Sequence, residues 1–164
     1  MHASRRRSGP LCPGGGPPVT VGRRTYLFYP VLIVSGFLLN FCWESVHGLL
    51  YRAHQELPAS VYVPMMAQAA LLDALWITGM QLCVALYSRS RSWGFSVRSV
   101  LLFSAAGMLP AMAVEYVAVF RLHLWAYAGP MPTLFGIGVS PLLQMPITGF
   151  AAVAAARAAA GSER

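Results

Sequence analysis

The stretch YLFYPVLIVSGFLLNFCWESVHGLLY, residues 26–51, decides the fold of this chain. It is long enough to cross a bilayer, which takes about 20 mostly apolar residues in a helix. Its second half nevertheless carries Asn40, Glu44 and His47. An acidic side chain at bilayer depth costs about 2.5–3.5 kcal/mol on insertion scales, whereas in a loop it costs little. The stretch therefore predicts a membrane helix that carries a polar site.

The composition of the whole chain is typical of a membrane protein. Of its 164 residues, 57% are hydrophobic and 10% are charged, against roughly 25% charged in soluble domains. The 12 basic residues are all arginines, and they lie between the apolar segments. This distribution indicates membrane topology rather than a surface for nucleic acid. We predict the lipid bilayer as a partner and no nucleic acid.

Four apolar segments predict an all-α fold, an antiparallel bundle of four transmembrane helices. Their approximate bounds are 26–50, 61–87, 97–122 and 134–157. The linkers between them are short and carry proline, glycine or arginine, which end helices or mark the membrane surface. Residues 1–22 are rich in arginine, glycine and proline and are predicted to be a disordered tail before a membrane domain at 23–160.

The arginines also predict an orientation, because short cytoplasmic loops carry the excess of positive charge. Ten of the 12 lie before the first span, around the second loop or after the fourth span, and only Arg52 and Arg121 lie elsewhere. We predict a multi-pass protein of the cell membrane with both termini in the cytoplasm. The first and third loops then lie outside.

Polar residues recur at helical spacing in two of the spans. One stripe comprises Asn40, Glu44, His47 and Tyr51, and a second comprises Ser140, Gln144 and Thr148. Each stripe keeps to one face of its helix, and in lipid such a face turns toward the interior. With Asp73 and Glu115, three of the five acidic residues are predicted to share that interior, in the middle and outer half of the bundle.

A polar interior does not by itself imply chemistry. Buried amides and hydroxyls often serve as interhelical hydrogen bonds worth about 0.6 kcal/mol, and that reading stays open for Asn40 and Gln144. Carboxylates cost more to insert, so a function is favoured for Glu44, Asp73 and Glu115.

Several motifs occur together between residues 38 and 146: NFCWESVHGLLY, DALWI, EYVAVFRLHLWAY, MP and GIGVSPLLQ. In this combination the chain resembles a family of small bacterial four-span membrane proteins. The resemblance implies a four-helix membrane fold and brings no known activity with it. It picks out Trp43, Glu44, His47, Asp73, Glu115, Trp125, Tyr127, Pro132, Pro141 and Gln144. The family often has glycine where this chain has Leu122 or His123.

The first functional hypothesis is acid–base chemistry on a lipid or isoprenoid-like substrate, at a site open to the outer leaflet. Burial and a second carboxylate nearby both favour the protonated form of a carboxyl group, which gives an acid beside a base. The candidate catalytic residues are Glu44, His47, Asp73 and Glu115, with Glu115 expected beside Glu44. The candidate substrate-binding residues are Asn40, Trp43, Trp76, Trp125, Tyr127 and Gln144. Met66, Met80, Met108 and Met112 are expected to line the same pocket.

Two alternatives remain open. Glu44 and His47 form the Glu-x-x-His pair found in di-iron bundles, but those bundles need two such pairs and this chain has one. We therefore assign no metal ligand, and no cofactor motif identifies another group. A non-catalytic subunit, ligand-binding protein or proton-linked carrier is the other alternative, and four spans would require a carrier to form an oligomer. In its purely structural form, Glu44 would pair with Arg52 or Arg121 and line no cavity.

Nothing in the sequence supports nucleophilic hydrolysis or nucleotide binding. The chain lacks a Gly-x-Ser-x-Gly motif, and its GIGVS segment is too short for a phosphate loop and lacks the lysine.

Overall fold

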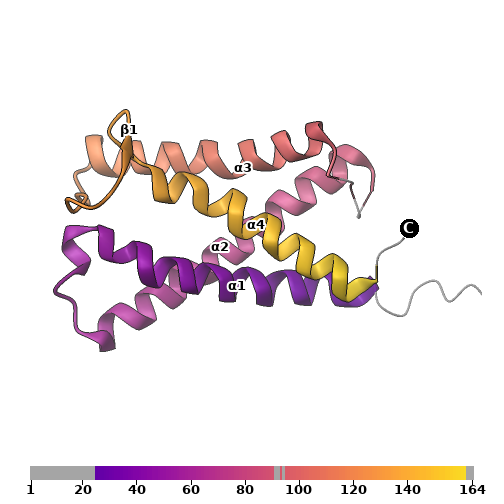
Figure 1. The fold of residues 1–164 in the computed structure, drawn as a ribbon, viewed down its shortest axis with the longest axis horizontal. Coiled ribbons are helices and arrows are strands. Elements are labelled where there is room, and N and C mark those ends of the chain that lie inside the picture. The colour runs from indigo at the N-terminus through magenta and orange to yellow at the C-terminus, as the bar shows by residue number, and fades with distance from the viewer. Residues whose placement is uncertain (1–24, 91–92, 94, 162–164) are drawn as a thin grey trace, which may run out of the picture.

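The computed structural model describes residues 25–90, 93 and 95–161, and in it the predicted all-α fold is confirmed (Figure 1). Four long helices form the bundle: α1 at Phe28–His47, α2 at Ala59–Ser88, α3 at Val97–Tyr116 and α4 at Val139–Ala160. All four are long and apolar enough to cross a membrane. The predicted tail at 1–22 lies outside the described residues.

Short elements extend or connect the helices. Turns of 3₁₀ helix lie at Thr25–Leu27, Gly48–Leu50 and Arg52–His54, and a π-helical turn at Val117–Arg121 extends α3. Two short antiparallel strands, β1 at Thr133–Leu134 and β2 at Ile137–Gly138, precede α4. When the adjoining 3₁₀ and π turns are counted, the predicted spans end within three residues of the observed helices except at the start of the fourth, which was predicted at 134 and begins at Val139.

The outer surface of the bundle is strongly apolar. Large side chains such as Leu38, Leu72, Leu86, Leu101 and Leu109 are more than half exposed. Soluble proteins seldom expose apolar surface on this scale, whereas lipid-facing helices do. The four helices are therefore those of a multi-pass membrane protein.

The two ends of the bundle are packed differently. At the end holding the start of α1 and the end of α4, buried apolar side chains such as Leu32, Ile77, Phe103 and Val153 form the core. Toward the other end α2 and α3 diverge, with α2 at the bottom and α3 at the top of the view (Figure 1). At this end the space between α2 and α3 is only partly filled by side chains and holds a cavity.

An ordered loop, residues 122–138, caps this open end. Its backbone bonds to the segment after α1: Arg52 N donates to Ala126 O at 3.0 Å, and Ala128 N donates to Leu50 O at 2.7 Å. We call this loop the cap. His123 has a φ of 51°, in the left-handed region that favours glycine.

Candidate functional site

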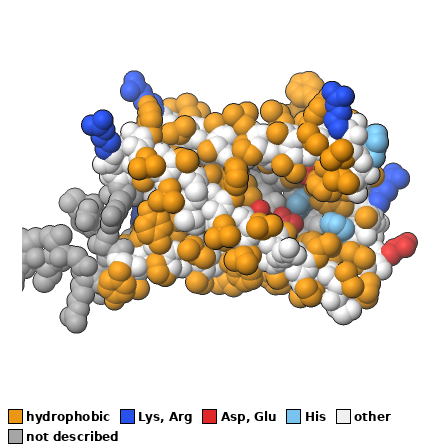
Figure 2. Space-filling view, turned by 180° about the vertical axis from the view of Figure 1, so that it is seen from behind, with side chains coloured by type: hydrophobic (Ala, Val, Ile, Leu, Met, Phe, Trp, Pro, Cys, Tyr) orange, Lys and Arg blue, Asp and Glu red, His pale blue; other side chains and the backbone are white. Residues whose placement is uncertain are grey.

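A cavity of about 640 Å³ lies between α2 and α3 in the capped half of the bundle. Side chains of α1 and α4 form its floor, and Trp125 of the cap closes its outer end. From the side opposite to Figure 1, the surface is hollowed, and acidic and histidine side chains are visible within an apolar rim (Figure 2). The hollow faces sideways out of the bundle, toward the region that lipid tails would occupy. Its volume lies within the roughly 300–1,000 Å³ range of small-molecule pockets.

The walls of the cavity are apolar. Met65, Met66 and Leu72 come from α2, and Val114 comes from α3. Gly107 of α3 also lines it, and a Cβ added there would lie 2.8 Å from Met145 Cβ. Glycine at this position therefore allows α3 to approach α4 closely enough to form the cavity floor.

A proline and a tryptophan close the inner end of the opening. Pro110 has no N–H and leaves the carbonyl of Ala106, one turn earlier in α3, without its helical donor. The indole Nε1 of Trp76 in α2 donates to that carbonyl at 3.3 Å. This bond joins α2 to α3 at the inner end of the opening, and Trp76 and Pro110 both line the cavity.

Two carboxyl groups lie side by side on one wall. Nε2 of Gln144 donates to Glu44 Oε1 at 2.6 Å and to Asp73 Oδ2 at 2.8 Å. The same nitrogen lies 3.1 Å from Asn40 Oδ1, which also accepts from the Thr148 hydroxyl at 3.0 Å. The predicted stripes of α1 and α4 thus meet, and their amides hold a carboxyl pair formed by α1 and α2. We call Glu44 and Asp73 the carboxyl pair.

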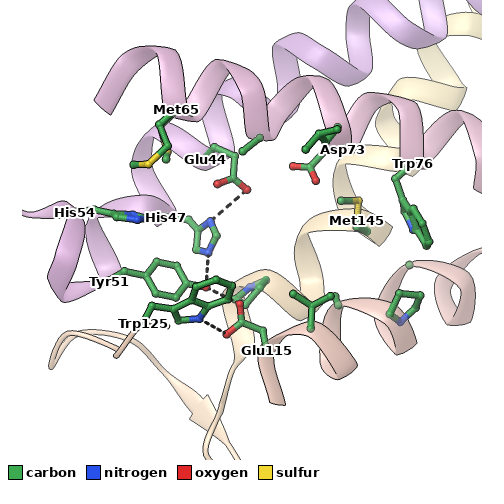
Figure 3. Close-up of a pocket in the computed structure, with 18 residues that line it drawn as sticks. Glu44, His47, Tyr51, His54, Met65, Asp73, Trp76, Glu115, Trp125 and Met145 are labelled. Carbon is green, nitrogen blue, oxygen red and sulfur yellow. Dashed lines mark hydrogen bonds and ion pairs between the residues drawn. The ribbon is translucent and has the colours of Figure 1, made fainter. Parts of the chain in front are cut away.

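A histidine and a tyrosine connect the carboxyl pair to the third acidic residue (Figure 3). His47 Nδ1 lies 3.7 Å from Glu44 Oε1, and its Nε2 lies 3.2 Å from the Tyr51 hydroxyl. That hydroxyl donates to Glu115 Oε1 at 2.8 Å. Since the Tyr51 proton is engaged with Glu115, Nε2 of His47 must be the donor in their contact. His47 and Tyr51 therefore lie in a row between Glu44 and Glu115, in which only the step from Glu44 to His47 is longer than a hydrogen bond.

Glu115 is anchored by the cap. It is 5% exposed, and its Oε2 accepts from the Tyr127 hydroxyl at 2.5 Å and from Trp125 Nε1 at 3.4 Å. The Tyr127 hydroxyl in turn accepts from the backbone N–H of Gly138 at 2.9 Å. With Tyr51, three donors meet this one carboxyl group, which is the pattern that stabilises an ionised carboxylate.

Both tyrosines bound to Glu115 keep their protons firmly. Burial, and then the charge of Glu115, raise the pKa of Tyr51 far above its ordinary value. Burial and the hydrogen bond to Glu115 likewise raise the pKa of Tyr127. Both residues therefore remain hydrogen-bond donors at physiological pH.

The structure brings all four candidate catalytic residues together: Glu44, His47, Asp73 and Glu115 all line the cavity. It does not place Glu115 beside Glu44 as expected, because His47 and Tyr51 lie between them and Asp73 is the neighbour of Glu44.

The candidate binding residues divide into two groups. Trp76 and Trp125 line the cavity, whereas Asn40, Tyr127 and Gln144 lie behind the carboxyl groups and hold them. Trp43 is a correction: it does not line the cavity, and its indole Nε1 is buried without a hydrogen-bond partner among the described residues. Helical spacing identified the polar faces but could not separate lining residues from supporting ones.

The methionine prediction was correct only for Met66. Met80 packs in the apolar core, and Met108 and Met112 are exposed on the outer surface. Met65 and Met145 line the cavity instead.

Two further lining residues, Tyr51 and His54, had not been assigned to the site. Tyr51 was detectable as the last member of the first polar stripe. His54 lies beyond the helix, where spacing gives no signal, and its Nδ1 lies 3.0 Å from Gly48 O.

Two alternatives can be compared with this geometry. No three His, Cys, Asp or Glu side chains of the described residues are arranged to hold a metal ion. The pairing of Glu44 with Arg52 or Arg121, which the purely structural alternative predicts, is not found: Arg52 Nε donates to Tyr127 O at 3.0 Å, and Arg121 lies over the Tyr116 ring at 5.9 Å. Glu44 instead lines a cavity and contacts an amide and a histidine.

The site thus combines an apolar, sideways-facing cavity with proton-carrying groups on opposite walls. Such groups can give and accept protons at positions within hydrogen-bond reach of a bound molecule. Function is inferred from this geometry alone, because comparison of the chain with protein-family profiles, curated proteins and solved structures found no match.

Proposed function

We propose that this protein is an intramembrane acid–base enzyme that admits an apolar lipid or isoprenoid-like substrate from the bilayer. The observation that carries the proposal is the row of proton-carrying groups from the carboxyl pair through His47 and Tyr51 to Glu115, alongside an apolar cavity. In this row only the 3.7 Å step between Glu44 and His47 is longer than a hydrogen bond. A site that only bound a ligand would need the cavity and one or two polar contacts. It would not need a row of proton-carrying groups between two walls.

The carboxyl pair supplies the acid and the base. Two adjacent carboxylates in a medium of low polarity are stable when they share one proton, as in other enzymes with paired carboxyl groups. The protonated member can donate to the substrate, and the other can accept. After one turn the pair again holds one proton, and that proton returns to the first carboxyl group by transfer between the two neighbours. Where the substrate takes up or gives up a net proton, Glu115 can supply or receive it through His47 and Tyr51.

The arginine distribution supports a position of the site in the outer half of the cell membrane. With both termini in the cytoplasm of a cell-membrane protein, the cap and the carboxyl groups lie in the outer half of the bilayer. The sideways opening between α2 and α3 would then receive molecules from the outer leaflet, and an oligomer would have to leave this face free.

The test is lipid profiling of cells that express the wild type, Glu44→Gln or Glu56→Gln. Glu44→Gln keeps the shape of the side chain and removes a proton-transfer group. Glu56→Gln removes a carboxylate from an exposed position outside the cavity and is the matched control. Relative to cells without the protein, we expect the abundance of at least one lipid species to change when the wild type or Glu56→Gln is expressed. The abundance of that species should not change when Glu44→Gln is expressed. Identical profiles from all three at equal protein levels would overturn acid–base catalysis.

A further inference from the structure

The hydrogen-bond inventory of the cavity restricts what can bind there. The two indole N–H groups and the tyrosine hydroxyl among the described residues that line it are already engaged with the protein. Trp76 Nε1 is bonded to Ala106 O, and Trp125 Nε1 and the Tyr51 hydroxyl are bonded to Glu115. The amide of Gln144, behind the wall, is shared among three acceptors although it carries two hydrogens.

The polar atoms of the cavity that can still form hydrogen bonds to a ligand are acceptors. The carboxyl pair accepts from Gln144 and has further lone pairs. His47 is 7% exposed, and its Nδ1 has no hydrogen-bond partner in the described part of the chain. Because Nε2 of His47 donates to Tyr51, Nδ1 of the neutral ring is an acceptor, and the gap of 3.7 Å to Glu44 is too long for a direct hydrogen bond. Nδ1 of His47 faces Glu44 across this gap (Figure 3), so a ligand donor that approached the gap from the cavity would meet an acceptor on each side.

The charge of the site points to a cation. Three carboxyl groups line the cavity, and no arginine or lysine does so among the described residues. If Glu44 and Asp73 share one proton, one negative charge remains on the pair. Buried charge without a partner is costly, so an occupant of opposite charge is strongly favoured. The rings of Trp125 and Tyr51 at the same end add faces that attract cations.

We propose that the ligand is a cationic amphiphile with a primary amine head, and this rests on the proposed function of the same site. The ammonium group is placed between His47 Nδ1 and the carboxyl pair, where it donates to both. The apolar chain lies along the walls formed by Met65, Leu72 and Val114, and it leaves through the opening toward lipid. Anionic lipids are disfavoured, because three carboxyl groups line the cavity and no arginine or lysine of the described residues does.

The test compares three probes of equal chain length on the purified protein in a neutral detergent: dodecylamine, dodecanol and dodecanoate. Binding is measured by tryptophan fluorescence, since Trp76 and Trp125 line the cavity. We expect the amine to bind at least about tenfold more tightly than the alcohol, the order of a desolvated cation–π contact or ion pair. Dodecanoate should bind most weakly. Equal binding of amine and alcohol, or preferred binding of dodecanoate, would overturn the proposal.

Variants of the carboxyl pair test whether the preference for the amine over the alcohol depends on Glu44 and Asp73. Glu44→Gln and Asp73→Asn should each reduce the ratio of amine to alcohol affinity to near one, while Glu56→Gln should leave it unchanged. Only variants that melt within a few degrees of the wild type are compared, and the three-probe ranking on the wild type decides the question if neither variant folds. A preference that survives in both folded variants would contradict the assignment.

The two proposals can fail separately. If amine and alcohol bind equally while the cellular lipid profile still depends on Glu44, the amine head is wrong and the acid–base function stands. If the amine binds selectively but the profile does not depend on Glu44, the site binds this class of molecule without catalysis.

Discussion

At the scale of single residues, Tyr51 is the link on which the site depends. It contacts His47 and Glu115 through one hydroxyl, and its backbone pairs with that of Tyr127 in the cap. Tyr51→Phe keeps the ring and removes both hydroxyl contacts. We expect the variant to lose about 1.5–3 kcal/mol of stability, the range for hydrogen bonds to charged groups. The measurement is the melting temperature in detergent, with exposed Tyr26→Phe as the control, and equal losses in the two variants would contradict the role of Tyr51.

The same tyrosine predicts how stability changes with pH. Because burial and Glu115 raise the pKa of Tyr51, the folded state keeps a proton that an unfolded tyrosine releases near pH 10. This contribution to stability is complete below about pH 10 and decreases as the pH rises further. Tyr51→Phe should therefore lose less stability than the wild type between pH 9 and about pH 11. Parallel curves of melting temperature against pH would contradict this explanation.

Gln144 does not line the cavity, but its amide holds the carboxyl groups that do. Its amide is the donor shared by Asn40, Glu44 and Asp73. Gln144→Leu leaves buried acceptors without a donor, which costs about 1–3 kcal/mol. The exposed Gln68→Leu on α2 is the control and should melt with the wild type. A Gln144→Leu protein as stable as this control would show that the amide is not needed to hold the carboxyl pair.

At the scale of elements, the close approach of α3 to α4 depends on a missing side chain. A Cβ at Gly107 would lie 2.8 Å from Met145 Cβ and 3.0 Å from Met80 Cε. Gly107→Ala should therefore force the helices apart, at a cost of about 1–3 kcal/mol, and change the cavity floor. Gly36→Ala is the matched control, because its Cβ would meet Ala74 at an ordinary 3.5 Å. A drop in melting temperature for Gly36→Ala as large as that for Gly107→Ala would contradict this explanation.

The elements also show what the sequence could and could not predict. Length and apolar character were sufficient for the four helices, because lipid requires each span to satisfy its own backbone. They failed at 134–138, where apolar residues continue into α4 without interruption. Phe135 and Gly136 both have positive φ, 53° and 79°, and form the tight turn between β1 and β2. Apolarity cannot reveal such a turn, since the loop and the helix that follows are equally hydrophobic.

At the scale of the whole molecule, the helical stripes predicted that polar faces would meet, but the crossing of the helices decided which residues meet. The divergence of α2 from α3 opened a cavity beside Asp73 and Glu115. The neighbour of Glu44 is therefore Asp73 rather than Glu115. Spacing within one helix contains no information on the angle between two helices, so this pairing could not be deduced.

The orientation of the molecule is also a property of the whole chain. If the arginine distribution sets the topology, the loop holding Glu56 lies outside the cell and the loop holding Ser90 lies in the cytoplasm. In a protein whose native cysteines have been replaced, Glu56→Cys should react with a membrane-impermeant maleimide on intact cells. Ser90→Cys should react only after the cells are opened. The reverse pattern, or labelling of both from outside, would contradict the predicted topology.

The central claim is that the cavity between α2 and α3 receives a molecule from the bilayer. The most direct measurement is mass spectrometry of the lipids that copurify with the protein, comparing the wild type with Ala111→Trp and Ala113→Trp. Ala111 lines the cavity, whereas Ala113, on the same helix, is exposed on the outer surface. We predict a bound amphiphile in the wild type and in Ala113→Trp that is lost from Ala111→Trp at unchanged melting temperature. The same copurifying lipids in all three proteins would contradict the claim.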